Sequence, residues 1–164
     1  MVPVHIWLPE AHVEASTIGS VFLASILLKL GGYGIIKFIL PCLPQASKIY
    51  MSYLEMITSI GFLYCCFAAL WQTDLKKIIA YSSVVHMHIV FFSIFSFNSK
   101  AIVGSIILMI SHGLTSSGLF FCLGSIYDRF SIRDFMQIRG LVHCMPIFVV
   151  FFFFFIISNI AFPG

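Results

Sequence analysis

Long apolar runs alternate with short polar connections along the 164-residue chain. Each run holds roughly 20 mainly apolar residues, the length that an α-helix needs to cross the hydrocarbon core of a bilayer. The pattern therefore predicts an all-α, polytopic membrane protein of about five transmembrane helices in a single domain, residues 16–164. The predicted spans cover about residues 16–40, 50–70, 78–97, 101–126 and 145–161.

The first 15 residues carry a different, mixed pattern. Trp7, Pro9 and Glu10 stand close together in this stretch. Tryptophan favours the boundary between membrane and water, and proline can break a helix. We predict that residues 1–15 form an interfacial segment that leads into the first span.

The composition excludes several classes of protein. The chain is 60% hydrophobic and 9% charged, whereas a soluble domain has about 25% charged residues. The net charge of +3 is small and no basic run is present, so nucleic acid is not an expected partner. The five cysteines are scattered without metal-site spacing, and we expect neither a metal nor a redox cofactor on this chain.

Basic residues gather on one side of the predicted helices. Five spans place residues 71–77 and 127–143 on the same side of the membrane. That side carries Lys76, Lys77, Arg129, Arg133 and Arg139. Because loops rich in lysine and arginine stay inside, we predict that this side faces the cytoplasm or its organellar equivalent.

Lys29 lies deep within the first predicted span, about a dozen residues from either end of the apolar run 18–41. A lysine at the centre of a membrane helix costs about 2.5–3.5 kcal/mol on insertion scales. The alternative is a side chain that snorkels to the interface, which suits Lys37 better because Lys37 is near the end of the run. We predict that Lys29 occupies a polar or hydrated interior and carries a proton.

The fourth predicted span contains a polar stretch with two glycines, residues 110–118. Serine and threonine hydroxyls can bend a helix, so we predict that this helix is interrupted here. Ser105, His112 and Ser116 recur at helical spacing and form one polar stripe. Two interpretations remain open, a hydrated His112 that carries protons and a close helix–helix contact made by small residues.

The third predicted span offers His86 and His88, which point to nearly opposite faces of a helix. His86 shares a stripe with serines and is the preferred interior residue, while His88 is a weaker candidate. Asp74, together with Lys76 or Lys77, is either a paired switch at the interface or ordinary solvated charge.

Lys29, His86 and His112 stand on three different spans and predict a proton path, because histidine titrates near neutral pH. Ser116, His88, Asp74 and Lys76 are weaker members of the predicted site. The path lacks a deep carboxylate that could alternate with the lysine.

Four segments, in order along the chain, resemble the antiporter-like subunits of respiratory complex I, the proton-pumping NADH:quinone oxidoreductase, and match its chain 4 type best. They are residues 5–15 (HIWLPEAHVEA), 27–34 (LLKLGGYG), 72–83 (QTDLKKIIAYSS) and 111–117 (SHGLTSS). The resemblance runs from end to end, and four long segments in register are far more specific than any one of them.

The resemblance implies a fold of two inverted five-helix repeats, each with a broken helix, of which this chain corresponds to most of the second. It implies that Lys29 is the central lysine of a hydrated axis and that His112 is its conducting histidine. A second lysine and a glutamate of that axis are missing from the chain. Companion fragments of a split subunit would supply them, or the sequence is incomplete.

The resemblance further implies a membrane-arm subunit that helps to conduct protons, without redox chemistry on this chain. NADH, FMN, iron–sulfur clusters and ubiquinone would belong to the rest of the complex, and other membrane-arm subunits and lipid would be the partners. The expected location is the mitochondrial inner membrane, or the plasma membrane of a bacterium. A cation/proton antiporter subunit and a structural membrane scaffold are the alternatives.

Overall fold

The computed structural model describes residues 3–131, 134–138 and 140–160. Within these ranges the secondary structure consists of helices and one isolated β-bridge. The irregular first span comprises α2 (Thr17–Phe22), the π-helix η1 (Leu23–Leu27), α3 (Leu28–Gly34), the π-helix η2 (Ile35–Ile39) and α4 (Leu40–Cys42). The remaining helices are α1 (Trp7–Glu14), α5 (Pro44–Ile49), α6 (Met51–Leu70), α7 (Leu75–Phe95), α8 (Ser99–Phe130), the 3-10 helix η3 (Phe135–Gln137), α9 (Leu141–Cys144) and α10 (Pro146–Asn159).

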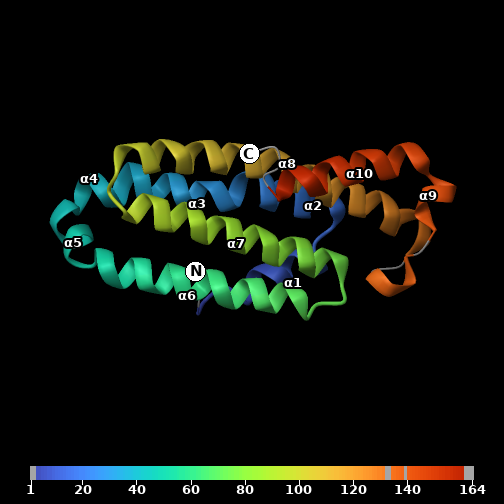
Figure 1. Ribbon diagram of the computed structural model, residues 1–164, viewed down its shortest axis with the longest axis horizontal. Helices are drawn as coiled ribbons and strands as arrows, with labels where there is room; N and C mark the ends of the chain where they lie inside the picture. Colours follow the sequence, from blue (N-terminus) through green and yellow to red (C-terminus); the bar gives the residue numbers. More distant parts are fainter. Residues whose placement is uncertain (1–2, 132–133, 139, 161–164) are drawn as a thin grey trace.

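Four long helices lie side by side, with α7 between α6 and α8 (Figure 1). Among the described residues, the helices long and apolar enough to cross a membrane are Thr17–Cys42, α6, α7 and α8. The shorter apolar helix α10 packs along one half of α8. This arrangement confirms the prediction of an all-α, polytopic membrane protein.

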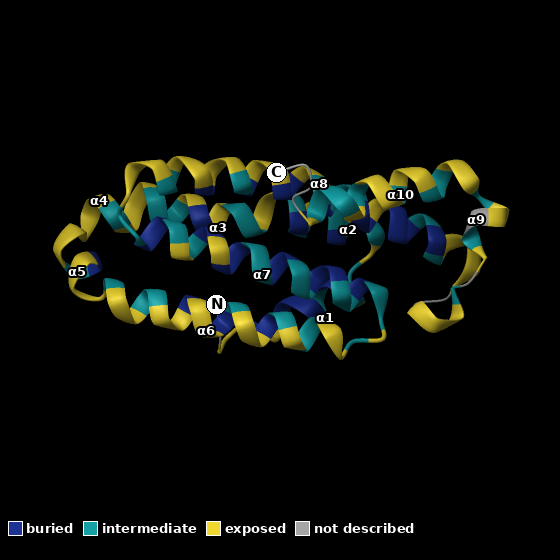
Figure 2. Cartoon of the chain, in the orientation of Figure 1, coloured by how far each residue is buried: buried dark blue, intermediate teal, exposed yellow. Residues whose placement is uncertain are grey.

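The core lies between the first span, α7 and α8. Ala24, Ala80 and Phe120 are buried at this junction, and the other members of the same cluster are Ile79, Leu119, Leu123 and Ile126. Large apolar side chains on the outward faces of the other helices are exposed, whereas α7 is mostly buried or half-buried (Figure 2). An apolar exterior is what a bilayer requires, because the hydrocarbon core solvates apolar side chains and not polar ones.

The irregular helix is the first span and not the fourth. Two π-turns, η1 and η2, interrupt the first span, whereas α8 is continuous through residues 110–118. The prediction of a break in α8 is therefore wrong. Its hydroxyls bond to carbonyls within the helix: Ser111 donates to Leu108, Thr115 and Ser116 donate to His112, and Ser117 donates to Leu114. Because these polar groups are satisfied locally, the helix continues.

One face of the expected interfacial segment packs into the bundle, while Val4, Ile6 and Trp7 are exposed. Helix α1 contacts α7, and Leu8, Pro9 and His12 are buried. Ser20 of α2 donates a hydrogen bond of 3.0 Å to the carbonyl of His12. This contact ties α1 to the first span.

Two polar connections meet at one end of the bundle, as an even number of intervening spans requires. Phe135 N–H donates to the carbonyl of Thr73 at 3.1 Å. The backbones of Asp74 and Asp134 form an isolated antiparallel β-bridge. The connections 71–77 and 127–143 thus share a side, although Arg133 and Arg139 lie outside the described residues.

We predict that Gly124→Ala destabilises the bundle by about 1–3 kcal/mol, the usual cost of overpacking. A Cβ at Gly124 would lie 2.5 Å from Thr17 Cγ2 and 2.8 Å from Thr17 Cβ. Threonine is branched at Cβ and cannot easily move aside. The midpoint of thermal unfolding of the membrane-embedded protein measures the effect.

Gly104→Ala is the matched control for this prediction. Gly104 lies on the same helix, and a Cβ at this position would meet no described atom within 4 Å apart from its chain neighbours and the backbone of its own helix. Equal unfolding midpoints for the two variants would contradict the tight contact between α8 and the start of α2.

Candidate proton-transfer site

The three residues selected from the sequence meet in the interior of the bundle. Lys29 Nζ lies 3.0 Å from His112 Nδ1, which joins the first span to α8. The ring centroids of His112 and His86 are 4.9 Å apart, with 43° between the ring planes, which joins α8 to α7. An amine and two imidazoles, all able to exchange protons, are therefore in contact across three helices.

A π-turn positions the lysine. Lys29 is the second residue of α3, directly after η1, and its ammonium also donates to the carbonyl of Ala24. A π-turn changes the backbone hydrogen-bond register of a helix and often occurs at functional sites. Here the Ala24 carbonyl becomes a partner for the ammonium, which helps to offset the cost of a cation inside the bundle.

Gly113 allows the lysine to approach α8. A Cβ at Gly113 would lie 3.5 Å from Lys29 Cε and 3.3 Å from the carbonyl oxygen of Ser25. A larger side chain there would separate the first span from α8. The glycine next to His112 therefore keeps the amine within reach of the imidazole.

The contact determines the tautomer of His112. A protonated lysine only donates hydrogen bonds, so His112 Nδ1 accepts and the proton of the neutral ring resides on Nε2. His112 is 4% exposed, and its Nε2 has no hydrogen-bond partner among the described residues. A buried donor of this kind costs about 1–3 kcal/mol unless water or another group binds it.

Ser116 is buried one turn below His112, as the polar stripe predicts. Its hydroxyl donates to the carbonyl of His112 at 2.6 Å, and Thr115 donates to the same carbonyl at 3.3 Å. These bonds hold the hydroxyls against their own helix. Ser116 therefore supports the backbone at His112, without a bond to the ring.

Sequence reasoning missed Asn159 at the end of α10. Its side-chain amide donates to the hydroxyl of Ser82 at 3.4 Å, and Ser82 lies on the same helix as His86, one turn earlier. A polar residue that follows a run of phenylalanines was the available signal. Asn159 brings α10 to the same site as His86.

Lys76 and Asp74 do not pair with each other. Lys76 is 6% exposed, donates to the Ala15 carbonyl at 3.2 Å and lies 5.7 Å from the centre of the Tyr127 ring. Asp74 lies instead beside Lys77, with 3.9 Å between the charged atoms. Lys76 thus binds the C-terminal end of α1, where a cation also complements the helix dipole.

His12 is more deeply placed than the sequence indicated. Its ring stacks on Phe120 with 4.5 Å between centroids, and neither ring nitrogen has a hydrogen-bond partner among the described residues. His12 lies outside the four long spans, and burial, followed by the charges of Lys76 and Lys29, lowers its pKa to about 4. His12 is therefore neutral at physiological pH.

His86 and His88 face opposite sides of α7, as their spacing predicts. His86 contacts His112 of α8, whereas His88 lines a cavity with residues of α6. The preference for His86 as the interior residue needs correction, because His88 is only 2% exposed. Both are interior because α7 has a neighbouring helix on each side.

A groove next to Lys29 opens between the first span and α8. Its volume is about 660 Å³, and Tyr33, Ile110 and Ser117 line it together with Lys29. Within the described part of the chain, no cluster of three or more histidine, cysteine or acidic side chains is arranged to hold a metal ion. The chemistry that these residues support is proton transfer between an amine and imidazoles.

Known proteins share the sequence pattern and the fold of this chain. The family model described as "NADH:quinone oxidoreductase/Mrp antiporter, TM" matches residues 1–164. NADH-ubiquinone oxidoreductase chain 4 of Chondrus crispus is 53% identical over 100% of this chain and 33% of its own length. The chain thus spans about a third of the length of that relative.

Two solved structures resemble the fold. Respiratory complex I from Thermus thermophilus with bound NADH contains a chain that is 25% identical, with a TM-score of 0.92 over 99% of this chain and 35% of that chain. The Mrp complex from Dietzia sp. DQ12-45-1b contains one that is 23% identical, with a TM-score of 0.89 over 96% of this chain and 29% of that chain. The second likeness concerns the fold alone.

We predict that Lys29→Leu shifts the ¹⁵N resonance of His112 Nδ1, because the variant removes a donor 3.0 Å away. Solid-state NMR of the histidine-labelled protein in bilayers measures the shift. Lys37→Leu is the control, since Lys37 lies on the same span, eight residues further along and near its end. An identical His112 resonance in all three proteins would refute the contact.

Proposed function

Because this chain belongs to the NADH:quinone oxidoreductase/Mrp antiporter transmembrane family, we propose that it conducts protons as part of a membrane-arm subunit of NADH:ubiquinone oxidoreductase. The observation that carries the proposal is the contact of Lys29 with His112 and of His112 with His86. The contact joins three helices through groups that bind and release protons.

The geometry supports a simple sequence of proton transfers. The Lys29 ammonium donates its proton to His112 Nδ1, and the imidazolium releases the other proton from Nε2 to a water molecule bound there. One proton enters at the amine and one leaves at Nε2, so the ring returns to neutral as the other tautomer. Return of His112 to its first tautomer and protonation of Lys29 then reset the site.

The low dielectric of the bundle makes this site responsive to nearby charge. A cation inside a membrane protein is costly, and an anion close to it lowers the cost. A carboxylate brought near Lys29 would hold the proton there, and its removal would drive the proton towards His112. Companion segments that supply such a carboxylate and a further lysine form part of this proposal.

Electron transfer takes place elsewhere in the proposed complex. NADH, FMN, the iron–sulfur clusters and ubiquinone are assigned to other subunits, and this chain contributes proton conduction only. Its neighbours in the proposal are other membrane-arm subunits and lipid, in the mitochondrial inner membrane or in a bacterial plasma membrane. The apolar outer faces of the helices suit both kinds of neighbour.

A cation/proton antiporter subunit is the second candidate function. The family model that matches the chain includes Mrp antiporters as well as NADH:quinone oxidoreductases. A lysine and histidine cluster suits either function, because both move protons across a membrane. The proteins that assemble with the chain distinguish the two candidates.

We predict that Lys29→Met leaves the protein inserted and assembled but lowers proton pumping coupled to NADH oxidation several-fold. Methionine keeps roughly the length of the side chain and removes its ionisable proton. Lys37→Met is the matched control and is expected to pump normally, because Lys37 lies near the end of the span and away from His112. Proton uptake by native membrane vesicles during NADH oxidation measures the effect.

Three results would change the proposal. Unaltered pumping in Lys29→Met would reject the role of the lysine. Loss of sodium tolerance with intact NADH oxidation would favour the antiporter. Normal function of both Lys29→Leu and His112→Leu would favour a structural scaffold.

Separation of native membrane complexes, followed by mass spectrometry, tests the predicted partners. We expect this chain to migrate with NADH dehydrogenase activity, together with peptides that carry the additional lysine and glutamate. If the subunit is split, those peptides belong to separate chains. If it is not, they belong to one polypeptide that also contains this chain. Migration apart from that activity would refute the assignment to this enzyme.

A further inference from the structure

Two buried polar atoms on neighbouring helices have unused hydrogen-bonding capacity. They are His112 Nε2 on α8 and Asn159 Oδ1 at the end of α10. Neither atom has a hydrogen-bond partner among the described residues. Buried polar atoms almost always have a partner, so each of these two atoms requires one.

The two atoms are complementary, one a donor and the other an acceptor. The Ser82 hydroxyl donates its single hydrogen to the carbonyl of Ile79 at 2.8 Å. Ser82 Oγ therefore accepts the 3.4 Å hydrogen bond from Asn159 Nδ2, which fixes the orientation of the amide and leaves Oδ1 as the unused acceptor. His112 Nδ1 accepts from Lys29, so Nε2 carries the hydrogen of the neutral ring.

The register of α8 and α10 places the two residues at nearly the same level. The helices pack side by side and run in opposite directions (Figure 1). A Cβ at Gly118 would lie 2.5 Å from the Phe155 ring, so these two residues face each other. Asn159, one turn beyond Phe155, is then level with about Leu114, and a rise of 1.5 Å per residue puts His112 about 3 Å further along the axis.

The contacts of α7 give a similar separation. His86 touches the His112 ring, and Ser82, which binds Asn159, precedes His86 by one turn of the same helix. One turn is about 5.4 Å along the axis. Two hydrogen bonds of about 2.8 Å each, with one water molecule between them, span a distance of that order.

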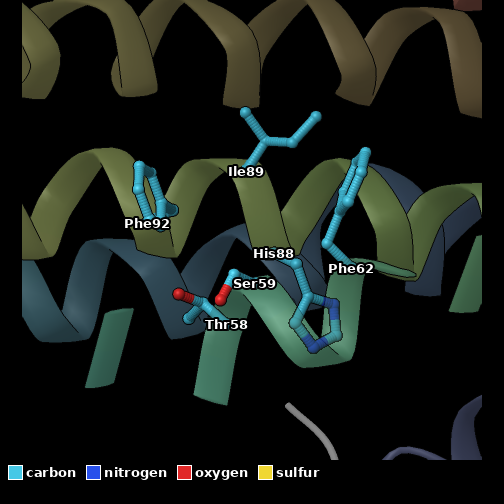
Figure 3. A pocket seen from close by; sticks show the side chains of 6 residues that line it. All are labelled: Thr58, Ser59, Phe62, His88, Ile89 and Phe92. Carbon is cyan, nitrogen blue, oxygen red and sulfur yellow. The ribbon is translucent and has the colours of Figure 1, made fainter. Parts of the chain in front are cut away.

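The other polar groups near His112 are engaged or face elsewhere. Thr115 and Ser116 donate to the carbonyl of His112 on their own helix. The His86 ring touches the His112 ring without a hydrogen bond to Nε2. His88 faces α6, where its ring lies beside Thr58 and Ser59 (Figure 3).

The remaining buried side-chain atoms without a partner, among the described residues, are ring nitrogens of His5 and His12. His5 packs against Tyr64 of α6. His12 stacks on Phe120, which is eight residues and more than two turns from His112 on α8. Asn159 Oδ1 is therefore the unused acceptor at the level of His112.

We propose that Asn159 Oδ1 is the acceptor that serves the Nε2–H group of His112, through bound water between α8 and α10. The water accepts the hydrogen bond from Nε2 and donates one of its own hydrogens to Oδ1. Asn159 is thus a positioning residue, held by Ser82, that orients the water against the imidazole. Release of the Nε2 proton to this water rests on the proposed function, whereas the two hydrogen bonds do not.

A water-resolving structure of the unaltered protein in its native membrane complex is the first test. We expect ordered water within hydrogen-bond distance of both His112 Nε2 and Asn159 Oδ1. Absence of water at Nε2, or water there that does not reach Oδ1, would overturn the proposal.

Solid-state NMR of the histidine-labelled protein in bilayers is the second test. We expect Asn159→Leu to move the proton resonance of His112 Nε2–H upfield, because the group loses its hydrogen bond. Asn159→Asp keeps an acceptor oxygen at the same place and is expected to retain a downfield resonance. Ser158→Ala is the matched control, since Ser158 is the preceding residue and its hydroxyl donates to Phe155 of its own helix.

An unchanged Nε2–H resonance in Asn159→Leu would overturn the proposal. Equal shifts in Asn159→Leu and Ser158→Ala would also overturn it, because the effect would then reflect general packing of α10. An upfield shift in Asn159→Asp as large as that in Asn159→Leu would count against it in the same way. Both measurements report hydrogen bonds and not pumping, so a failure of this inference is distinguishable from a failure of the proposed function.

Discussion

The ammonium of Lys29 inside the helical bundle is the constraint on which the surrounding structure depends. A cation at this depth requires hydrogen-bond acceptors and close packing, and neither is available from a regular apolar helix. The π-turn provides the Ala24 carbonyl, α8 provides the His112 ring, and Gly113 permits their approach. The irregular first span, the glycine of α8 and the buried histidine are thus parts of one arrangement around a single charge.

The polar residues differ in whether their hydrogen bonds stay within one helix or join two helices. Serine and threonine hydroxyls within α8 donate to carbonyls of the same helix, which leaves the helix intact and its hydroxyls engaged. The amine and the imidazoles instead form contacts between helices. The proposed proton exchange between helices therefore involves Lys29 and the histidines, whereas the hydroxyls bond to the backbone of their own helix.

Helix α7 packs between α6 and α8, so its two histidines have different neighbours. His86 and His88 are two residues apart on a helix and therefore face different sides. His86 faces α8, and His88 faces α6 and the turn before α1. Lys76, at the start of the same helix, binds the end of α1. A shift of α7 would thus change the contacts of both histidines and of α1 together.

The sequence by itself determined the class of protein and the helical fold, and it singled out Lys29, His86 and His112, which the structure brings into contact. Apolar runs of spanning length allow little except helices, and a lysine at that depth is too costly to be incidental. The four family segments made the assignment specific. Only the tertiary structure decided that the π-turns lie in the first span, that α8 is continuous, and that His12, His88 and Asn159 lie inside. Helical spacing fixes the face on which a residue lies, but the helix that covers that face depends on packing between distant segments.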